Sequence, residues 1–329
     1  MLDIICEIAN GYYGNLQISK KYIDIAARAK SNAVKFQIAY ADDMLQKRDK
    51  IFKIIKKNEM SFSTWSKIRK YAKKNKIKFY LDIDGEKALD IAKKIKPDAV
   101  KIHTTSFFDQ RLLLNALAYF KYIYISISGI KDVEIKKVYS LIKRKKFQKK
   151  VTFLYGHQNV PTKIEDTNLS RLIYLKEKYK NIKFGFMDHI DGSSDYKYSL
   201  SVFALGLGIN CFEKHLTFSR KKKLIDSTSA LEEKEFVNYI KILNDHKKSL
   251  GKFKKNLTDS EIKYRNNALT VIHSKVKIKR DQKIKYSLIT HKRPLKFSKK
   301  YFYDPEKILG KKSKVDININ QPILVNQIK

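Results

Sequence analysis

Two lysines stand on the polar face of segments that are otherwise apolar, where a buried side chain could do chemistry. Lys35 alternates with apolar residues in Ala33–Ala39, and Lys101 does the same in Ala99–His103. Successive side chains of a strand point to opposite faces, so both lysines would enter one interior. Burying ammonium groups is costly unless an anion accompanies them. The pair therefore predicts a phosphate or carboxylate site, whereas either lysine alone could simply end a frayed strand.

Two histidines predict a metal site at the same end of the predicted strands. His189 closes the segment Lys183–His189, and His215 shares one face of Cys211–Thr217 with Glu213. If these strands are neighbours, about 4.8 Å apart, both imidazoles could hold one divalent metal ion. Two protein ligands leave positions open for substrate and water, as a Lewis-acid catalyst requires. The alternative for each is a histidine that is satisfied within the core.

Two carboxylates are expected near the same end of the strands. Glu7 lies on the first predicted strand, and Asp226 follows the eighth. Either could orient a hydroxyl group or take up a proton. The alternative for each is a structural carboxylate at a strand end or helix cap.

Strand-like runs alternate with helix-length amphipathic stretches, the pattern of parallel βα units. Eight strands are predicted, at Asp3–Ala9, Ala33–Ala39, Lys78–Ile83, Ala99–His103, Tyr122–Ser128, Val151–His157, Lys183–His189 and Cys211–Thr217. Helices are predicted at Gln17–Ala29, Ser63–Lys74, Glu86–Lys94, Gln110–Tyr119, Val133–Arg144, Asn168–Tyr179, Tyr196–Leu205 and Glu232–Lys247. Eight repeats over about 250 residues suit a closed (β/α)8 TIM barrel of the α/β class. An open doubly wound sheet is the alternative, but Asn10–Gly14 does not fit its glycine-rich fingerprint.

The pattern changes after Lys254, where short strands replace long helices. These strands are predicted at Ala268–Ile278, Ile284–His291 and Ile323–Val325. The polar stretch before them, which carries Gly251, favours a linker. We therefore expect a barrel domain over residues 1–252, a linker over 253–262 and a small β-rich domain over 263–329.

The composition is that of a globular chain with an extreme positive charge. The 329 residues are 43% hydrophobic and carry a formal net charge of +38. The lysines are spread over almost every predicted helix and no nucleic-acid motif accompanies them. This distribution favours a solvated surface over attraction of an anionic substrate, and either over nucleic-acid binding.

Neither an export signal nor a membrane span is visible in the sequence. The longest apolar run, Ser199–Leu207, is far below the roughly 20 residues that cross a bilayer, and the first residues carry acids. Cys6 and Cys211 lie in apolar segments far apart in sequence, which suits buried thiols in a reducing compartment. We expect a cytoplasmic protein.

A series of motifs runs nearly from end to end of the chain. They are Glu7–Gly14, Ala33–Gln37, Ala99–His103, Val160–Thr162, Glu165–Leu169, Gly185–His189, Ala204–Gly208, Phe212–His215, Asp226 and Ser229–Phe236, then Tyr264–Ala268, His291–Pro294 and Ile308–Lys311 in the tail. In this order and spacing they resemble the sialic acid synthase family, whose members make nine-carbon acidic (nonulosonic) sugars. The tail resembles that family's antifreeze-like domain.

The resemblance implies a reaction and roles for particular residues. Phosphoenolpyruvate would condense with an N-acyl amino-sugar aldehyde: its methylene attacks the aldehyde, water adds, and phosphate leaves. By analogy, His189 and His215 would bind a divalent metal, Mn²⁺ or Mg²⁺, and Lys35 and Lys101 would bind phosphoenolpyruvate. The candidate catalytic residues are Glu7 and Asp188. The candidate substrate-binding residues are Gln37, Thr104, Ser126 (with which Ser128 competes), Gln158 and Asp226.

The resemblance also implies how copies of the chain assemble. Arg293, in the Lys-Arg-Pro motif of the tail, would reach the sugar's N-acyl group in the barrel of a partner subunit. A domain-swapped homodimer is therefore expected. From the sequence alone, an arginine on a surface strand is the alternative.

Several positions depart from the family's pattern. Leu81–Asp84 replaces the usual Ser-Thr-Pro-Phe, Thr104–Ser106 replaces Ser-Gly-Asp or Ser-Gly-Glu, and Met187 replaces the serine of Ser-Asp-His. These changes spare the two histidines and the two lysines, so we expect retained chemistry on an altered acceptor. The alternatives are a phosphoenolpyruvate-dependent synthase for another sugar aldehyde, and a catalytically silent relative that binds an anionic sugar or polyanion.

Overall fold

The chain forms two compact units. The computed structural model describes residues 2–222, 225–251, 256–295 and 298–329. Unit 1 spans Met1–Gly251 and unit 2 spans Lys252–Lys329.

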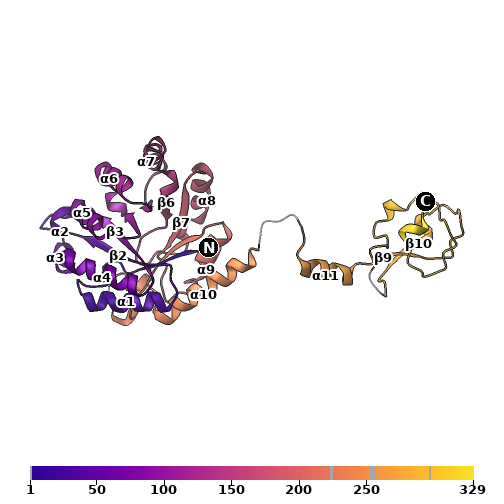
Figure 1. Ribbon diagram of the computed structural model, residues 1–329, viewed down its shortest axis with the longest axis horizontal. Helices are drawn as coiled ribbons and strands as arrows, with labels where there is room; N and C mark the ends of the chain where they lie inside the picture. Colours follow the sequence, from indigo (N-terminus) through magenta and orange to yellow (C-terminus); the bar gives the residue numbers. More distant parts are fainter. Residues whose placement is uncertain (1, 223–224, 252–255, 296–297) are drawn as a thin grey trace. The chain divides into compact units, whose positions relative to one another are not determined.

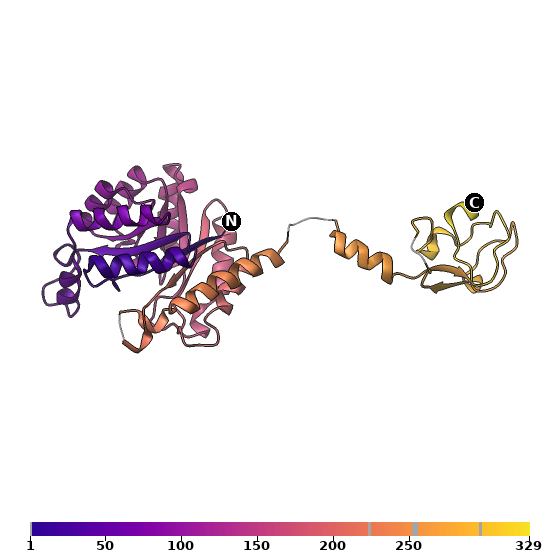
Figure 2. The same cartoon turned by 60° about the horizontal axis from the view of Figure 1, so that its bottom comes forward.

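Unit 1 is a closed barrel of parallel strands surrounded by helices (Figures 1 and 2). Its strands are β1 (Asp3–Glu7), β2 (Ala33–Ala39), β3 (Lys78–Asp84), β4 (Ala99–Ile102), β5 (Ile123–Ser126), β6 (Val151–Tyr155), β7 (Lys183–Asp188) and β8 (Cys211–His215). Each strand pairs with the next along the chain, and β8 closes the barrel against β1. The predicted (β/α)8 barrel is confirmed.

The helices that follow the strands agree with the predicted ones to within a few residues at their ends. They are α1 (Leu16–Arg28), α4 (Phe62–Lys74), α5 (Glu86–Ile95), α6 (Gln110–Tyr119), α7 (Asp132–Arg144), α8 (Leu169–Lys178), α9 (Ser199–Gly206) and α10 (Glu233–Ser249). Local sequence sets their starts: Asn15 caps α1 by accepting the backbone N–H groups of Gln17 and Ile18. Two short helices after β2 were not predicted, α2 (Ala41–Met44) and α3 (Phe52–Asn58). No helix in the described ranges is long and apolar enough to cross a membrane.

Strand alternation divides the barrel residues as the sequence predicts. Val34, Phe36 and Ile38 of β2 belong to the outer core beneath the helices. A set of inward side chains forms a separate apolar layer, which we call the inner plug; its members are Ile5, Ala33, Tyr80, Ala99, Tyr124, Leu154, Met187 and Cys211. Toward the C-terminal ends, the inward positions become charged and polar. The site lies there.

Unit 2 is small and has its own isoleucine-rich core. It contains α11 (Asp259–Ala268) and the antiparallel strands β9 (Val271–Ser274) and β10 (Ile289–Lys292). Its core residues are Ile272, Ile278, Ile284, Ile289, Ile308, Ile317, Ile323 and Ile328. Of the predicted linker 253–262, residues 253–255 lie outside the described residues. The rest differs from the prediction, because the capping box of Thr258 and Glu261 starts α11 inside it.

The strands predicted in unit 2 are shorter than expected. Residues 284–288 end in a 3-10 turn, Tyr286–Leu288, rather than a strand. The stretch predicted at Ile323–Val325 makes only an isolated antiparallel bridge, between Leu324 and Tyr301.

Candidate active site

A cavity of about 380 Å³ opens at the C-terminal ends of the barrel strands. Several predicted site residues line it: Glu7, Gln37, Lys101, Gln158, His189, His215 and Asp226. Ile51 and Ile54, from the segment around α3, contribute apolar walls. This is the end at which TIM-barrel enzymes carry their active sites.

Both predicted lysines point into the barrel, but carboxylates already meet their charges. Lys35 is fully buried, and its Nζ lies 2.7 Å from Glu7 Oε2 and also contacts Glu213 Oε2. Lys101 Nζ lies 2.9 Å from Glu213 Oε1 and 3.0 Å from Asp82 Oδ2. Glu213 therefore bridges the two lysines. The anion required by the buried ammonium groups is supplied by the chain itself, a role that was not predicted for Glu213.

The network of two lysines and three carboxylates has one excess negative charge, which shows in the pKa of its members. Burial raises the pKa of Glu7 to about 7, against the opposing attraction of Lys35. Burial would also raise the pKa of Glu213, but Lys101 and Lys35 outweigh it and lower that pKa. Burial would lower the pKa of Lys101, yet the surrounding carboxylates raise it. Glu7 is thus the member that exchanges a proton near neutral pH.

The two histidines meet above this network. His189 and His215 are each 5% exposed, and their Nε2 atoms lie 3.1 Å apart. Burial lowers the pKa of His215 to about 3, and burial with the nearby His215 lowers the pKa of His189. Both rings are therefore neutral at pH 7, the form that binds metal ions.

The separation of the two nitrogens fits a shared ion. Two ligands in adjacent octahedral positions, each about 2.1 Å from the metal, stand about 3.0 Å apart. Within the described ranges no group of three His, Cys, Asp or Glu side chains gathers around such a position. Of the described residues, His189 and His215 are the ones that would hold a metal here, and both line the cavity.

Three predicted substrate-binding residues form one hydrogen-bonded group beside the cavity. Thr104 Oγ1 lies 2.5 Å from Ser126 Oγ and donates to Gln158 Oε1 at 2.8 Å. The competing Ser128 has no part in this group. On the other side of the cavity, Gln37 Oε1 accepts a hydrogen bond from Asn10 Nδ2 at 2.8 Å. Hydrogen bonds therefore position these polar groups around the cavity.

The two aspartates that depart from the family pattern both line the cavity. Asp82 pairs with Lys101, as described above. Asp84, 3% exposed, accepts hydrogen bonds from Thr105 Oγ1 at 2.7 Å and from Ser106 Oγ. Sequence alternation placed both carboxylates on one face but could not assign these partners.

Comparison with known proteins agrees with this geometry. Residues 22–255 match the model of the NeuB family. The chain belongs to the NeuB family.

Two proteins of Campylobacter jejuni are similar in sequence to this NeuB family chain. The pseudaminic acid synthase is 25% identical over 334 residues, covering 97% of this chain and 94% of the relative. The N,N'-diacetyllegionaminic acid synthase is 24% identical, covering 88% and 90%. A solved structure of N-acetylneuraminic acid synthetase from Leptospira borgpetersenii has a TM-score of 0.74 and 27% identity, covering 81% of this chain and 92% of that one.

Two residues named as site candidates lie elsewhere in this NeuB family chain. Asp188 points out of the barrel, where its carboxylate pairs with Lys214 at 3.1 Å and accepts a hydrogen bond from Ser201 of α9. The prediction of a catalytic Asp188 is therefore wrong in position, because alternation turns it away from the face of His189. Arg293 lies exposed in unit 2, after β10.

Asp226 stands at the mouth of the cavity. Its backbone is in the left-handed region, with φ 57°, just before the 3-10 turn Ser227–Ser229. Burial raises the pKa of this carboxyl. It is the second carboxylate, after Glu7, whose protonation is shifted toward neutral pH.

Proposed function

We propose that this NeuB family chain condenses phosphoenolpyruvate with an N-acyl amino-sugar aldehyde to form a nonulosonic acid and phosphate. The main support is the paired His189 and His215, neutral and 3.1 Å apart, directly above buried lysines in a cavity at the C-terminal end of the barrel. The names of its relatives, pseudaminic and legionaminic acid synthases, support the same product class.

His189 and His215 would hold a divalent metal, Mn²⁺ or Mg²⁺. When bound, such an ion supplies Lewis-acid polarisation of a substrate carbonyl oxygen. The protein's own contribution is to keep both imidazoles neutral through burial.

Lys101 and the hydroxyl group of Thr104 and Ser126 would position phosphoenolpyruvate. Lys101 is the lysine that lines the cavity, whereas Lys35 lies beneath it and fixes Glu7 and Glu213. When Glu7 takes up a proton, the buried network becomes neutral and no longer repels an anionic substrate. Positioning and electrostatics supply the catalysis in this proposal.

Glu7 is the candidate for proton transfer. The new carbon–carbon bond forms between the phosphoenolpyruvate methylene and the aldehyde carbon, and the aldehyde oxygen takes up a proton to become a hydroxyl group. Water then adds to the former enol carbon and gives up a proton, and phosphate leaves with its bridging oxygen as the bond between that oxygen and the carbon breaks, which forms the ketone. With a pKa near 7, Glu7 can give and take a proton in this sequence.

The assembly of the chain is part of the proposal. By analogy with the family, Arg293 would complete the sugar-binding end of the site in a domain-swapped homodimer in the cytoplasm. An Arg293→Ala variant should raise the KM for the sugar more than the KM for phosphoenolpyruvate. Mixing it with a His215→Ala variant should restore part of the activity, because some swapped sites would then be intact. A failure of mixing to restore activity contradicts the swapped arrangement.

One experiment tests the reaction itself. Purified protein with Mn²⁺ and phosphoenolpyruvate is given a panel of N-acyl hexosamines that includes dideoxy-diamino sugars, and phosphate release is followed. His189→Ala and His215→Ala should each lower the rate at least about a hundredfold and abolish Mn²⁺ binding measured by calorimetry. His246→Ala, an exposed histidine of α10, is the matched control. No release with any sugar contradicts the synthase, and full Mn²⁺ binding by both variants contradicts the metal role.

A further inference from the structure

A second and larger hollow, of about 620 Å³, lies at the opposite end of the barrel. Its walls come from the starts of the strands, including Asp3 of β1, Lys78 of β3 and Lys183 of β7. We call it the basal hollow. Tyr80, Tyr124 and Cys211 of the inner plug form part of its lining, so the plug separates it from the cavity of His189 and His215.

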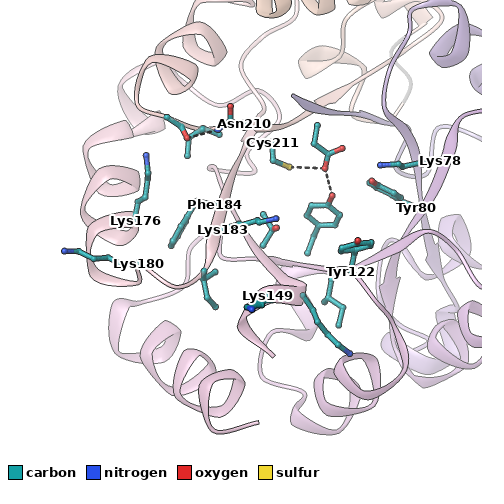
Figure 3. Close-up of a pocket in the computed structure, with 18 residues that line it drawn as sticks. Lys78, Tyr80, Tyr122, Lys149, Lys176, Lys180, Lys183, Phe184, Asn210 and Cys211 are labelled. Atoms are coloured by element: carbon teal, nitrogen blue, oxygen red, sulfur yellow. Dashed lines mark hydrogen bonds between the residues drawn. The ribbon is translucent and has the colours of Figure 1, made fainter. Parts of the chain in front are cut away.

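The basal hollow is strongly cationic. Six lysines line it: Lys78, Lys149, Lys150, Lys176, Lys180 and Lys183. Figure 3 shows Lys78 beside Tyr80 on one side and Lys176 and Lys180 on the other, with Lys149 and Lys183 between them. Among the described residues of the lining, the one acidic side chain is Asp3, and its carboxylate already accepts a hydrogen bond from Tyr124 Oη at 2.5 Å. A small anion inside would therefore face positive charge from several elements at once.

Four of these lysines have no hydrogen-bond or ion-pair partner among the described residues, and the other two donate only to neutral backbone carbonyl groups. Lys150 donates to the carbonyl of Leu117 at 2.7 Å, and Lys176 donates to the carbonyl of Leu207. The others, Lys78, Lys149, Lys180 and Lys183, make no ion pair or hydrogen bond with the residues that the structure describes. Lys149, Lys180 and Lys183 also line an adjoining hollow of about 390 Å³, which extends the cationic surface.

Aromatic side chains form another part of the lining of the basal hollow. Tyr122 is 49% exposed, and Tyr80 and Phe184 form part of the wall (Figure 3). An exposed aromatic face offers a stacking surface to a planar ring, and lysines bind phosphate as point charges. A volume of about 620 Å³ lies in the range that holds a small organic ligand.

We propose that the basal hollow binds a small ligand that carries two or more phosphate groups and a planar ring, the chemistry of a nucleoside di- or triphosphate. The lysines take the phosphates and Tyr122 takes the ring. This site is separate from the proposed reaction, since no residue that lines the cavity of His189 and His215 also lines the basal hollow.

Calorimetric titration of the full chain tests the site, with adenosine triphosphate and inorganic tripolyphosphate as probes at an ionic strength of about 0.15 M. The double variant Lys149→Gln/Lys183→Gln should weaken adenosine triphosphate binding about tenfold or more. The matched control, Lys234→Gln/Lys241→Gln on α10, removes the same charge from exposed positions and should change the affinity less than about twofold. Both pairs are exposed, so folding should be kept, which the fluorescence of Trp65 verifies.

Other results would overturn the assignment. Absence of adenosine triphosphate binding to the unaltered chain removes the site. Equal weakening by the two double variants means that binding follows the overall charge of the chain. Tripolyphosphate binding as tight as that of adenosine triphosphate removes the role of the ring. Tighter binding of a single-stranded DNA oligonucleotide, lost in the Lys149→Gln/Lys183→Gln variant, would identify a nucleic-acid surface instead.

Discussion

Replacing Lys35 by methionine tests whether the buried charge network stabilises the barrel. Lys35 Nζ contacts Glu7, at 2.7 Å, and Glu213, and the side chain is fully buried. Breaking a buried ion pair from one side costs about 3–5 kcal/mol. Because Glu7 has a pKa of about 7, it can take up a proton at neutral pH and relieve part of this cost. We expect a loss of about 3 kcal/mol in the free energy of unfolding at pH 7.

The pH dependence of this loss has a definite sign. In Lys35→Met, folded Glu7 keeps a proton above pH 7, whereas the unfolded chain has already released it. Above about pH 7, where Glu7 of the unaltered chain has lost its proton, the folded variant binds more protons than its unfolded chain, so its stability falls as pH rises by up to about 1.4 kcal/mol per pH unit relative to the unaltered chain. Adding Glu7→Gln to the variant removes the titrating group and should make this extra slope disappear.

Urea unfolding followed by tryptophan fluorescence measures both effects. Trp65 is the single tryptophan of the chain, and its 1% exposure within the barrel makes its emission a report on unit 1. The reasoning fails if Lys35→Met unfolds at the same urea concentration as the unaltered chain. It also fails if the single variant Lys35→Met and the double variant Lys35→Met/Glu7→Gln show the same pH slope.

Three further outcomes follow from the same structure, each measured by the Trp65 assay. In the unaltered chain, folded Glu7 holds its proton between pH 4.5 and about 7 while the unfolded chain loses it, so the free energy of unfolding falls as pH rises through this window. Glu7→Gln lacks this loss, so its free energy of unfolding should rise relative to that of the unaltered chain across the window. A difference between the two chains that stays constant with pH would contradict this prediction. Burial alone would raise the pKa of Glu235, but hydrogen bonds from Arg220 and Lys197 outweigh burial and lower this pKa to about 2. Glu235→Gln should therefore lower the free energy of unfolding by about 1 kcal/mol at pH 7, and this loss should shrink as the pH falls from 4.5 toward 2. A loss that does not change with pH would refute the pairing. Mn²⁺ at a hundred times its Kd should raise the free energy of unfolding by about 2.7 kcal/mol, and this gain should vanish in His215→Ala. A gain that persists in His215→Ala would place the ion elsewhere.

The sequence was sufficient to predict the barrel and the direction of its inward side chains. Period-two alternation predicted that Lys35 and Lys101 face one interior, because each lies between apolar neighbours that must pack under helices, and it placed His215 on the same face of its strand as Glu213. The same rule places Asp188 on the outer face of β7, where Lys214 pairs with it.

The partners of the buried lysines could not be predicted from the sequence. Glu213 on β8 meets Lys35 on β2 only because the barrel closes β8 against β1, between segments 178 residues apart. Strand alternation specifies only which face of a strand a side chain occupies. Whether a carboxylate bridges two lysines depends also on how far its side chain reaches across the barrel. The short helices α2 and α3 were missed for a local reason: seven residues or fewer are too few for a periodic pattern.

Two departures from the family pattern meet in the folded chain. The usual carboxylate after β4 is replaced by Thr104–Ser106, while β3 ends at Asp84 instead of a phenylalanine. Asp84 accepts hydrogen bonds from Thr105 and Ser106, so the carboxylate that one segment lacks stands on the neighbouring strand, supported by the hydroxyl groups of the other. Asp84 and Thr105 both line the cavity, away from the paired histidines of β7 and β8. A change at this wall leaves His189 and His215 in place and alters the surface that an acceptor would meet.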